Sequence, residues 1–464
     1  MLLVARGQTL VVGLGVSGQA IARHLARENV SFMVADTRQN PPGLAEFRRE
    51  HADVPIHCGS LGELDLEAFE EIVLSPGVDP RSPGLAPFWA RSQQGGTPRV
   101  VGEIALFTRA CHAPVAAITG ANAKSTVTTL LGEMACEAGV NVAVGGNLGT
   151  PALDLLHTHP DAELFVLELS SFQLETTPCL GAATAAFLNL SEDHLDRHGD
   201  MAGYRAAKLG IFRGARHAVV NAEDSMTWPD DERLPVDRFT TQPPDGQQWG
   251  IAVHDDGGGK APWLMHGTRL LMAVDELRLP GRHNQANALA ALAMGTRLGF
   301  SLEAMRRVLA RFAGLPHRGQ LVGEADGVRW VNDSKGTNVG ATLAAIAGLG
   351  VTLQGKLIWL GGGVGKGADF TPLAEPLARH AREAIVFGAD APRLAESLAA
   401  SVPVERRDSL EEALERASVI ARPGDCVLLS PACASLDQFA NYMARGDAFR
   451  QWVERYLADR QEGA

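Results

Sequence analysis

The chain has 464 residues, of which 45% are hydrophobic and 21% are charged, and its formal net charge is −12. A chain of this length usually divides into about two to four domains. The negative charge argues against a general affinity for nucleic acid or for anionic membranes, so we expect neither as a partner. No stretch approaches the roughly 18 uninterrupted apolar residues of a membrane-spanning helix, so no such helix is expected.

The cysteines form no C-x-x-C pair and no spacing typical of a metal site, which indicates reduced thiols in a cytoplasmic protein. The opening residues Met1–Gly7 lack the basic and then apolar order of a secretory signal peptide, which also favours a cytoplasmic location. We further expect a monomer. The six cysteines are Cys58, Cys111, Cys136, Cys179, Cys426 and Cys433.

Short β-branched runs alternate with Ala- and Leu-rich stretches, a pattern that predicts an α/β fold with mainly parallel sheets. A helix is predicted at Leu302–Phe312, and the Pro, Gly and Asp residues of Thr240–Pro262 predict an exposed loop. The predicted strands are Thr9–Val12, Phe32–Ala35, Ile72–Leu74, Pro114–Ile118, Leu164–Leu169, Ala185–Leu188, Ala218–Asn221, Leu357–Leu360, Ala384–Phe387 and Cys426–Leu429.

The first predicted strand leads into Gly13-Leu14-Gly15-Val16-Ser17-Gly18, a spacing that can place a pyrophosphate over a helix N-terminus. Asp36 ends the second strand about twenty residues later, where a carboxylate can bind a ribose hydroxyl. Taken alone, these features favour an NAD-dependent oxidoreductase. The same turn also suits another nucleotide pyrophosphate, or close packing alone. A second glycine turn, Ser75–Val78, follows the Ile72–Leu74 strand at the edge where open α/β sheets bind ligands.

The segment Ala117–Thr126 reads as a buried strand end, a loop of small residues and Lys124-Ser125-Thr126 opening a helix. Such a loop can direct N–H groups at a phosphate, with the lysine at the terminal phosphates and the serine on Mg²⁺. Ala123 stands where glycine usually precedes the lysine. If its φ is positive, alanine costs on the order of 1 kcal/mol, and otherwise it costs nothing. An ordinary strand-to-helix turn is the alternative.

Three polar clusters follow this loop, and each can also be explained as a helix cap or a solvated loop. Gly145–Thr150 is rich in glycine and carries Asn147, Glu168 ends an apolar strand, and Asn189–His198 follows the next strand. Because successive parallel strands end at the same edge of a sheet, the clusters converge there. A carboxylate at this edge suits Mg²⁺, which takes one or two carboxylates together with phosphate oxygens.

A longer succession of motifs resembles the Mur ligase family of bacterial cell-wall enzymes over essentially the whole chain. Two breaks in composition, the polar and Gly-rich Ser92–Pro98 and the Pro/Gly turn at Gly314–Gly319, predict three domains. The resemblance implies that the N-terminal domain, at 1–102, is Rossmann-like and binds a UDP-substrate. It further implies a central P-loop-like mononucleotide-binding ATPase domain at 103–313 and a Rossmann-like, amino-acid-binding C-terminal domain at 314–464. The motifs are Thr119–Thr126, Glu168–Leu174, Asn189–Arg197, Tyr204–Lys208, Arg282–Asn287, Gly314–Arg318 and Asn332–Asn338.

Within this family, Asp36–Arg38, Gly361–Gly367 and Leu429–Phe439 favour the members that add D-glutamate to UDP-N-acetylmuramoyl-L-alanine in peptidoglycan precursor synthesis. The Asp-Asn-Pro-Arg signature of the diaminopimelate- or lysine-adding members is absent from the sequence. Other Mur-type ligases and folylpolyglutamate synthetases share the ATP machinery and remain alternatives. An NAD-dependent oxidoreductase and a non-catalytic nucleotide-binding regulator are alternatives from other classes.

The resemblance implies that ATP phosphorylates the substrate carboxylate to an acyl phosphate, which the amine of D-glutamate then attacks. It implies two Mg²⁺ ions and a carbamate, derived from CO₂, on Lys208. The implied catalytic residues are Lys124, His194 and Lys208, and the implied metal ligands are Ser125, Glu168, His194 and Lys208. The implied ATP-binding residues are Gly120, Asn122, Ala123, Lys124, Ser125, Thr126, Asn287, Arg318 and Asp333.

The resemblance also implies a set of binding residues for each of the two other substrates. The UDP-substrate set is Gly15, Val16, Ser17, Asp36, Thr37, Arg38, Ser75, Gly77, Asn147 and His194. The amino-acid set is Lys335, Thr337, Lys366, Ser435, Leu436 (through its backbone N–H) and Tyr442. The Pro/Gly turn at Gly314–Gly319 is a candidate hinge for domain closure, which would protect the acyl phosphate from water.

Overall fold

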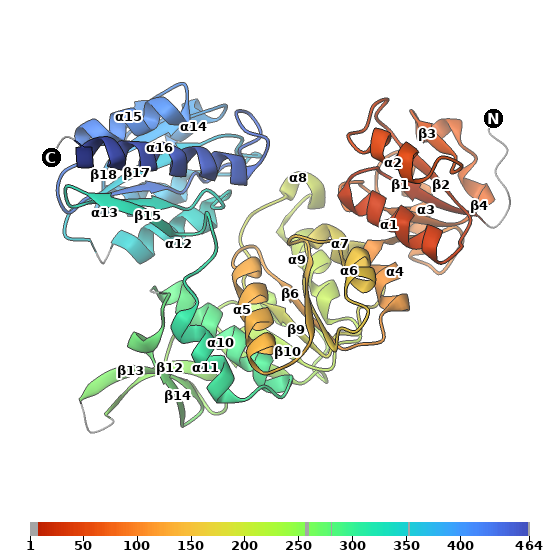
Figure 1. Ribbon diagram of the computed structural model, residues 1–464, viewed down its shortest axis with the longest axis horizontal. Helices are drawn as coiled ribbons and strands as arrows, with labels where there is room; N and C mark the ends of the chain where they lie inside the picture. The colour runs from red at the N-terminus through yellow and green to blue at the C-terminus, as the bar shows by residue number, and fades with distance from the viewer. Residues whose placement is uncertain (1–7, 256–258, 280, 351–352, 463–464) are drawn as a thin grey trace. The chain divides into compact units, whose positions relative to one another are not determined.

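The computed structural model describes residues 8–255, 259–279, 281–350 and 353–462. Internal contacts divide the chain into two compact units. The first unit comprises Met1–Leu190, Ala202–Val274 and Asn287–Leu309, and the second comprises Ser191–Met201, Asp275–Ala286 and Ala310–Ala464. Both units consist of mainly parallel sheets covered by helices (Figure 1), which confirms the predicted α/β class. The boundaries of the three predicted domains stay a prediction.

The N-terminal sheet of the first unit has five parallel strands in the order β3-β2-β1-β4-β5. Central β1 consists of Gln-Thr-Leu-Val-Val and is buried along nearly its whole length, as expected for a parallel strand covered on both faces. The strands are β1 Gln8–Val12, β2 Phe32–Asp36, β3 Ile56–Cys58, β4 Phe69–Leu74 and β5 Arg99–Gly102, and the helices are α1 Val16–Arg27, α2 Leu44–Glu50 and α3 Ala86–Ser92.

The central sheet has nine strands in the order β14-β13-β12-β11-β10-β9-β6-β8-β7. Its parallel strands are β6 Val115–Thr119, β7 Val142–Gly146, β8 Leu164–Glu168, β9 Thr184–Phe187, β10 Ala218–Asn221 and β11 Val236–Phe239. The helices along this part of the chain are α4 Glu103–Ala110, α5 Lys124–Glu137, α6 Ala152–Thr158, α7 Ser171–Glu175, α8 Leu195–His198, α9 Met201–Leu209, α10 Arg282–Arg297 and α11 Leu302–Arg311. The predicted helix at Leu302–Phe312 is therefore confirmed.

The expectation of an exposed loop at Thr240–Pro262 is wrong. Two antiparallel strands, β12 Trp249–Asp255 and β13 Lys260–His266, occupy much of it, and β14 Arg269–Ala273 follows. Of the Asp- and Gly-rich residues that suggested a loop, residues 256–258 lie outside the described residues. The strands are fixed by contacts between them, including the stacked rings of Trp249 and His266 with centroids 4.2 Å apart.

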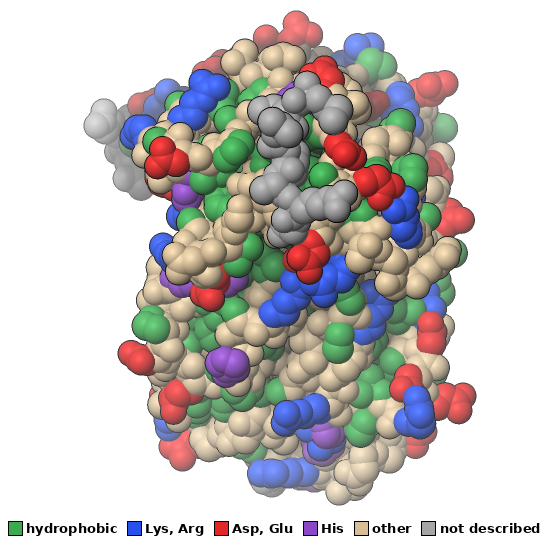
Figure 2. All heavy atoms as spheres, turned by 90° about the vertical axis from the view of Figure 1, so that its right-hand side faces the viewer, with side chains coloured by type: hydrophobic (Ala, Val, Ile, Leu, Met, Phe, Trp, Pro, Cys, Tyr) green, Lys and Arg blue, Asp and Glu red, His purple; other side chains and the backbone are tan. Residues whose placement is uncertain are grey.

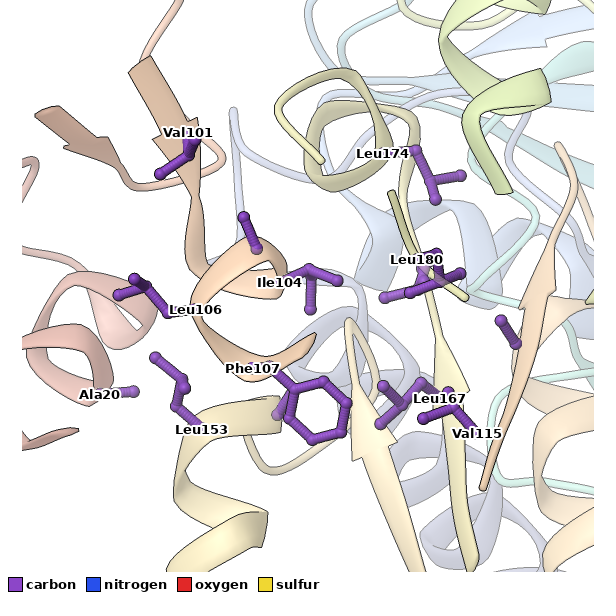
Figure 3. Packing of buried hydrophobic residues seen from close by; sticks show 14 of the residues in the cluster. Ala20, Val101, Ile104, Leu106, Phe107, Val115, Leu153, Leu167, Leu174 and Leu180 are labelled. Carbon is purple, nitrogen blue, oxygen red and sulfur yellow. The ribbon is translucent and has the colours of Figure 1, made fainter. Parts of the chain in front are cut away.

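One hydrophobic cluster connects the two sheets of the first unit. Figure 3 shows Ala20 of α1, Leu106 of α4 and Leu153 of α6 packed together, while Phe107 points toward Leu167 of β8 and Val115 of β6 in the central sheet. Arg23 of α1 adds a bidentate hydrogen-bonded ion pair with Asp154 of α6, at 3.1 and 2.6 Å. The two sheets therefore share a core, which fixes the space between their carboxyl edges.

The second unit has a six-stranded sheet in the order β15-β16-β20-β17-β18-β19, parallel except for the pair β15 and β16. Trp330 and Trp359 are fully buried on this sheet, in separate clusters. The strands are β15 Gln320–Ala325, β16 Val328–Asn332, β17 Leu357–Gly362, β18 Ala381–Phe387, β19 Val404–Arg406 and β20 Cys426–Leu429, and the helices are α12 Val339–Gly350, α13 Ala374–His380, α14 Ala391–Leu398, α15 Leu410–Ile420 and α16 Tyr442–Glu462.

All ten predicted strands are present, with ends shifted by no more than about three residues, as sequence-based boundaries usually are. In the described ranges, no helix combines the length and apolar character that crossing a bilayer requires. Figure 2 shows acidic and basic side chains interspersed over one face of the molecule, in keeping with the absence of a uniformly basic surface there.

Candidate functional site

The phosphate loop, defined here as Gly120–Ala123, connects the buried strand β6 to helix α5. Ala123 has φ +66° and ψ −5°, the left-handed conformation that favours glycine. The positive φ decides between the two cases that the sequence left open. At this position alanine is less favourable than glycine by on the order of 1 kcal/mol. The Lys124 ammonium donates to the carbonyl oxygens of Gly120 and Ala121, at 2.9 and 3.0 Å. The lysine thus lies over the loop, where it can meet terminal phosphates.

Oxygen ligands for a divalent cation gather beside this loop. The Ser125 hydroxyl donates to one carboxylate oxygen of Glu168, and the Asn147 side chain donates to the other at 2.6 Å. The Asn147 backbone N–H also donates to the Glu168 carbonyl oxygen, at 2.8 Å. A hydroxyl and a carboxylate held together are the hard oxygen donors that Mg²⁺ prefers, so Ser125 and Glu168 fit a Mg²⁺ ion.

Lys208 is only 1% exposed, which is rare for lysine in the absence of a specific role. Its ammonium donates to the Gly120 carbonyl oxygen at 2.7 Å and to the Thr119 hydroxyl at 3.3 Å. The ammonium also lies 4.8 Å from the centre of the Tyr204 ring. Helix α9 therefore delivers the Lys208 side chain to the phosphate loop, as expected if it works beside the phosphates.

The glycines of the N-terminal turn have distinct roles. A Cβ on Gly18 would lie 1.8 Å from the Gly13 carbonyl oxygen, so Gly18 allows α1 to pack on the turn. Gly13 has φ +94°, which the turn requires. A Cβ on Gly15 would meet nothing within 4 Å. Gly15 is thus open to a ligand, while the other two glycines shape the backbone.

A pocket of about 660 Å³ extends from this turn to the Gly-rich loop after β7. Nine of the ten UDP-substrate residues expected from the resemblance line it, and the tenth, His194, belongs to the second unit. The pocket also includes residues that sequence reasoning missed, of which Gln173 carries a signal: it is the third helical residue in a capping box with Ser170. The other lining residues are Val12, Gly13, Pro76, Val78, Asp79, Ser82, Gly146, Gly149 and Pro151.

The carboxylate of Asp36 accepts hydrogen bonds from neighbouring groups of the protein. It accepts the backbone N–H of Leu14 at 2.8 Å, the backbone N–H of Arg38 at 2.9 Å, and two guanidinium hydrogen bonds from Arg38 at 2.9 and 2.7 Å. Burial opposes ionisation, but these hydrogen bonds hold the pKa of Asp36 below its ordinary value. The carboxylate therefore fixes the turn and presents Arg38 at the pocket, an arrangement that does not favour the NAD interpretation.

In the second unit, Asp193 organises the loop that carries His194. It accepts hydrogen bonds from Lys366 at 3.2 Å and from Asn338 at 3.4 Å, and His194 has φ +55° beside it. Burial would raise the pKa of Asp193, but the charges of His194 and Lys366 hold it below its ordinary value. Asp193 was not among the expected site residues, although it lies within the predicted motif.

Asp333 lies at the carboxyl end of β16. It accepts the Ser430 hydroxyl at 2.7 Å and the backbone N–H of Gly319 at 3.1 Å. Burial raises the pKa of this carboxyl to about 6, although both hydrogen bonds oppose the rise. The aspartate thereby ties the turn that carries Arg318 to the sheet.

The expected amino-acid residues extend from neighbouring strand ends of the same sheet. The Lys335 ammonium lies 4.0 Å from the centre of the Tyr442 ring, Ser435 is buried and Leu436 is exposed. Sequence reasoning missed the fully buried Arg445, which donates to Ser334 and to the carbonyl oxygens of Gly362 and Cys433. Burial lowers the pKa of Arg445 to about 10. No local pattern marks this residue in the sequence.

The expected residues divide into two sets, one in each unit. Asn147, Glu168, Lys208, the phosphate loop and the pocket belong to the first unit, as does Asn287. The second unit holds His194, Arg318 and Asp333 together with the amino-acid set. Within the described residues, no group of three or more His, Cys, Asp or Glu side chains forms a metal site. Any Mg²⁺ bound here would therefore rely on ligands of other kinds as well.

Comparisons with known proteins give matches over nearly the whole chain. Three family models match: "Mur ligase MurD-like, N-terminal domain" at residues 7–94, "Mur ligase middle domain" at 118–295 and "Mur ligase, glutamate ligase domain" at 317–433. A UDP-N-acetylmuramoylalanine--D-glutamate ligase of Chromohalobacter salexigens is 68% identical, over 97% of this chain and 98% of that protein. A protein of the same name from Pseudomonas aeruginosa is 50% identical, over 96% of this chain and 97% of its own length.

Solved structures support the fold. A UDP-N-acetylmuramate-alanine ligase of Thermotoga maritima matches with a TM-score of 0.59 and 18% identity, over 98% of this chain and 99% of that one. The E. coli protein FolC, solved in complex with ADP, matches with a TM-score of 0.57 and 21% identity, over 77% of this chain and 93% of that one. At these low identities the solved structures support only the fold, whereas the relatives with similar sequences show the family. The chain belongs to the Mur ligase family.

Proposed function

We propose that this protein is an ATP-dependent ligase that joins D-glutamate to UDP-N-acetylmuramoyl-L-alanine in peptidoglycan precursor synthesis. The observation that carries the proposal is the 660 Å³ pocket, which extends from the Gly13–Gly18 turn to Asn147. Asn147 in turn contacts Glu168, the carboxylate beside the phosphate loop. A nucleotide-linked substrate bound at one end can thus present its reacting group at the other.

In this proposal, Gly15, Val16 and Ser17 bind the diphosphate of the UDP-substrate at the start of α1, where backbone N–H groups and the helix dipole favour anions. Thr37 and Arg38 bind the uridine end, oriented by Asp36. Ser75 and Gly77 complete that end of the pocket. Asn147, with His194, binds near the carboxylate of the muramoyl-alanine moiety.

ATP binds at the phosphate loop, where Lys124 offsets the charge of the terminal phosphates. Ser125 and Glu168 hold a Mg²⁺ ion, which when bound neutralises phosphate charge and orients the γ-phosphate. A second Mg²⁺ is assigned to His194 and to Lys208 as its carbamate, since an ammonium cannot ligate a cation and a carbamate offers two oxygens. Asn287, Arg318 and Asp333 complete the nucleotide site, with Gly120, Asn122, Ala123 and Thr126 of the loop and helix start.

The reaction follows from the need to form an amide in water. The substrate carboxylate attacks the γ-phosphorus of ATP, which gives an acyl phosphate and ADP. The amine of D-glutamate then attacks the acyl carbon, and phosphate leaves with the bonding electrons as the amine loses its proton. The protein contributes position and fixed charge rather than covalent chemistry.

The incoming D-glutamate carries two carboxylates, which need cations and N–H donors. Lys335, Thr337, Lys366, Ser435 and Leu436 are assigned to them, with Tyr442 beside Lys335. These residues come from the ends of β16, β17 and β20, so one sheet edge presents them together. We further propose a cytoplasmic monomer with three domains, at 1–102, 103–313 and 314–464.

The test is release of phosphate from ATP and Mg²⁺, with UDP-N-acetylmuramoyl-L-alanine and either D- or L-glutamate supplied. The proposal expects release only when the nucleotide sugar and D-glutamate are both present. Release with another amino acid would move the substrate assignment within the family. No release with any pair would contradict the ligase assignment itself.

A further inference from the structure

Asn189, which follows β9, both accepts hydrogen bonds from the phosphate loop and donates one to it. Its side-chain oxygen accepts the backbone N–H of Asn122 at 2.8 Å, and its side-chain N–H donates to the Asn122 carbonyl oxygen at 3.2 Å. Its own carbonyl oxygen accepts the N–H of Ala121, at 2.9 Å. The Asn189 side-chain amide therefore bonds the N–H and the carbonyl oxygen of Asn122 as the backbone of a paired strand would. Its hydrogen bonds continue the pairing of β6 and β9 into the phosphate loop.

The residue after Asn122 is the strained one. Ala123 adopts φ +66°, and an alanine disfavours that conformation by about fivefold relative to glycine. An alanine left to its own preference returns to negative φ, which turns the peptide groups on either side of it. The Ala123 carbonyl oxygen accepts the Val127 N–H at 3.0 Å, a bond that belongs to the start of α5. On the other side of the strained residue, Asn189 bonds both the N–H and the carbonyl oxygen of Asn122 and so can hold the loop in place.

The loop also fits tightly against this neighbour. A Cβ on Gly120 would lie 3.0 Å from the Asn122 carbonyl oxygen and 3.3 Å from the Leu188 side chain. The Gly120 carbonyl oxygen accepts hydrogen bonds from both Lys124 and Lys208. A shift of the loop away from Asn189 would therefore disturb both lysines assigned to the reaction.

We propose that Asn189 is a positioning residue that holds the phosphate loop in its ATP-binding conformation against the backbone preference of Ala123. The inference rests on the proposed function, because it assigns this loop to ATP. Asn189 itself is not assigned to any substrate.

Hydrogen exchange of peptides covering residues 119–126, measured without nucleotide, tests the restraint alone. Asn189→Ala is expected to speed exchange in this segment at least fivefold. Asn189→Asp keeps the acceptor and loses the donor, so an intermediate rate is expected. The matched control is Asn141→Ala, because Asn141 makes a similar amide-to-carbonyl bond, 2.9 Å to Asp161, before β7 at the opposite edge of the same sheet. Unchanged exchange in Asn189→Ala would overturn the inference.

Kinetics test the link to ATP. Asn189→Ala is expected to raise KM for ATP about tenfold and to leave KM for the UDP-substrate and D-glutamate within about twofold. In an Ala123→Gly background the same change is expected to raise KM for ATP only about twofold, since glycine accepts the conformation unaided. An equal effect in both backgrounds, or equal rises in all three KM values, would overturn the inference. Faster exchange in a protein whose wild type releases no phosphate would instead contradict the proposed function and leave the restraint standing.

Discussion

Two turns of the first unit share one plan, a buried strand, a short turn of small residues and the start of a helix, but they depend on glycine for different reasons. In the Gly13–Gly18 turn, the third glycine is required by packing, because a Cβ there would fall 1.8 Å from a backbone oxygen. In the phosphate loop, the corresponding requirement is a left-handed backbone, which Ala123 meets at a modest cost. A steric requirement leaves no substitute, whereas a conformational preference can be overcome by neighbouring hydrogen bonds.

The turns also differ in charge, because the phosphate loop is followed by the cationic Lys124. Among substitutions in the two turns, replacement of Lys124 is expected to lower activity most. Lys124→Ala removes the cation over the phosphate loop, so turnover is expected to fall by about a hundredfold to a thousandfold. The measurement is phosphate release with both substrates saturating, and circular dichroism checks that the variant is folded. A loss below tenfold would mean that the phosphate loop does not depend on this cation.

Gly18→Ala tests the steric half of the comparison. Because the added Cβ would meet the Gly13 carbonyl oxygen, the free energy of unfolding is expected to fall by about 3 kcal/mol or more. Urea unfolding measures it. Gly15→Ala is the matched control: its φ is −92° and its Cβ would meet nothing, so stability is expected to change little while KM for the UDP-substrate rises. Equal stability of the two variants would contradict the packing role of Gly18.

Glu103, which is buried at the start of α4, gives the stability of the protein a dependence on pH. The carboxyl is 1% exposed and accepts the Leu153 N–H at 3.3 Å. Burial raises its pKa from 4.5 to about 7, against the effect of this hydrogen bond. The unfolded chain therefore loses this proton before the folded one does. The neutral Glu103 carboxyl makes its full contribution to the free energy of unfolding below about pH 4.5. That contribution is lost as the pH rises to about 7.

The lost stabilisation amounts to at most about 3 kcal/mol, from the difference between the two pKa values. Glu103→Gln keeps a neutral side chain at every pH, so this part of the pH dependence is expected to disappear. Urea unfolding at pH 5 and pH 8 measures it, with wild type losing more stability than the variant between the two. Parallel pH dependence of the two proteins would show that Glu103 ionises normally in the folded state.

Ala123→Gly is expected to have the smallest effect. Glycine relieves the left-handed strain but loses more entropy on folding, so stability is expected to change by no more than about 1 kcal/mol. Turnover is expected to stay within about tenfold, as measured by phosphate release. A larger change in turnover would show that the methyl group of Ala123 has a role beyond backbone conformation.

The sequence predicts those parts of the structure that local patterns encode. Strand composition, glycine spacing and family motifs predict the buried strands of both units and the phosphate loop. They also predict nine residues that line the pocket beside the Gly13–Gly18 turn. The β12–β14 strands were missed because they are defined by pairing with each other, which the Pro, Gly and Asp residues of Thr240–Pro262 do not indicate. Glu103 and Arg445 were missed for a similar reason, since the partners of an isolated polar residue are set by tertiary contacts. Asn189 lies in the predicted Asn189–His198 cluster, but its bonds to the phosphate loop could not be predicted for the same reason.

The bond between Asn189 and the phosphate loop has a consequence for synthesis on the ribosome. The two residues that it joins are 67 positions apart in the chain. At roughly 5–20 residues per second, about 3–13 s pass between translation of Asn122 and that of Asn189. The phosphate loop thus emerges before the residue that holds it, and the nascent chain cannot form this restraint until Asn189, which follows β9, has been made. Ordering of the loop by Asn189 is therefore separated in time from synthesis of the loop itself.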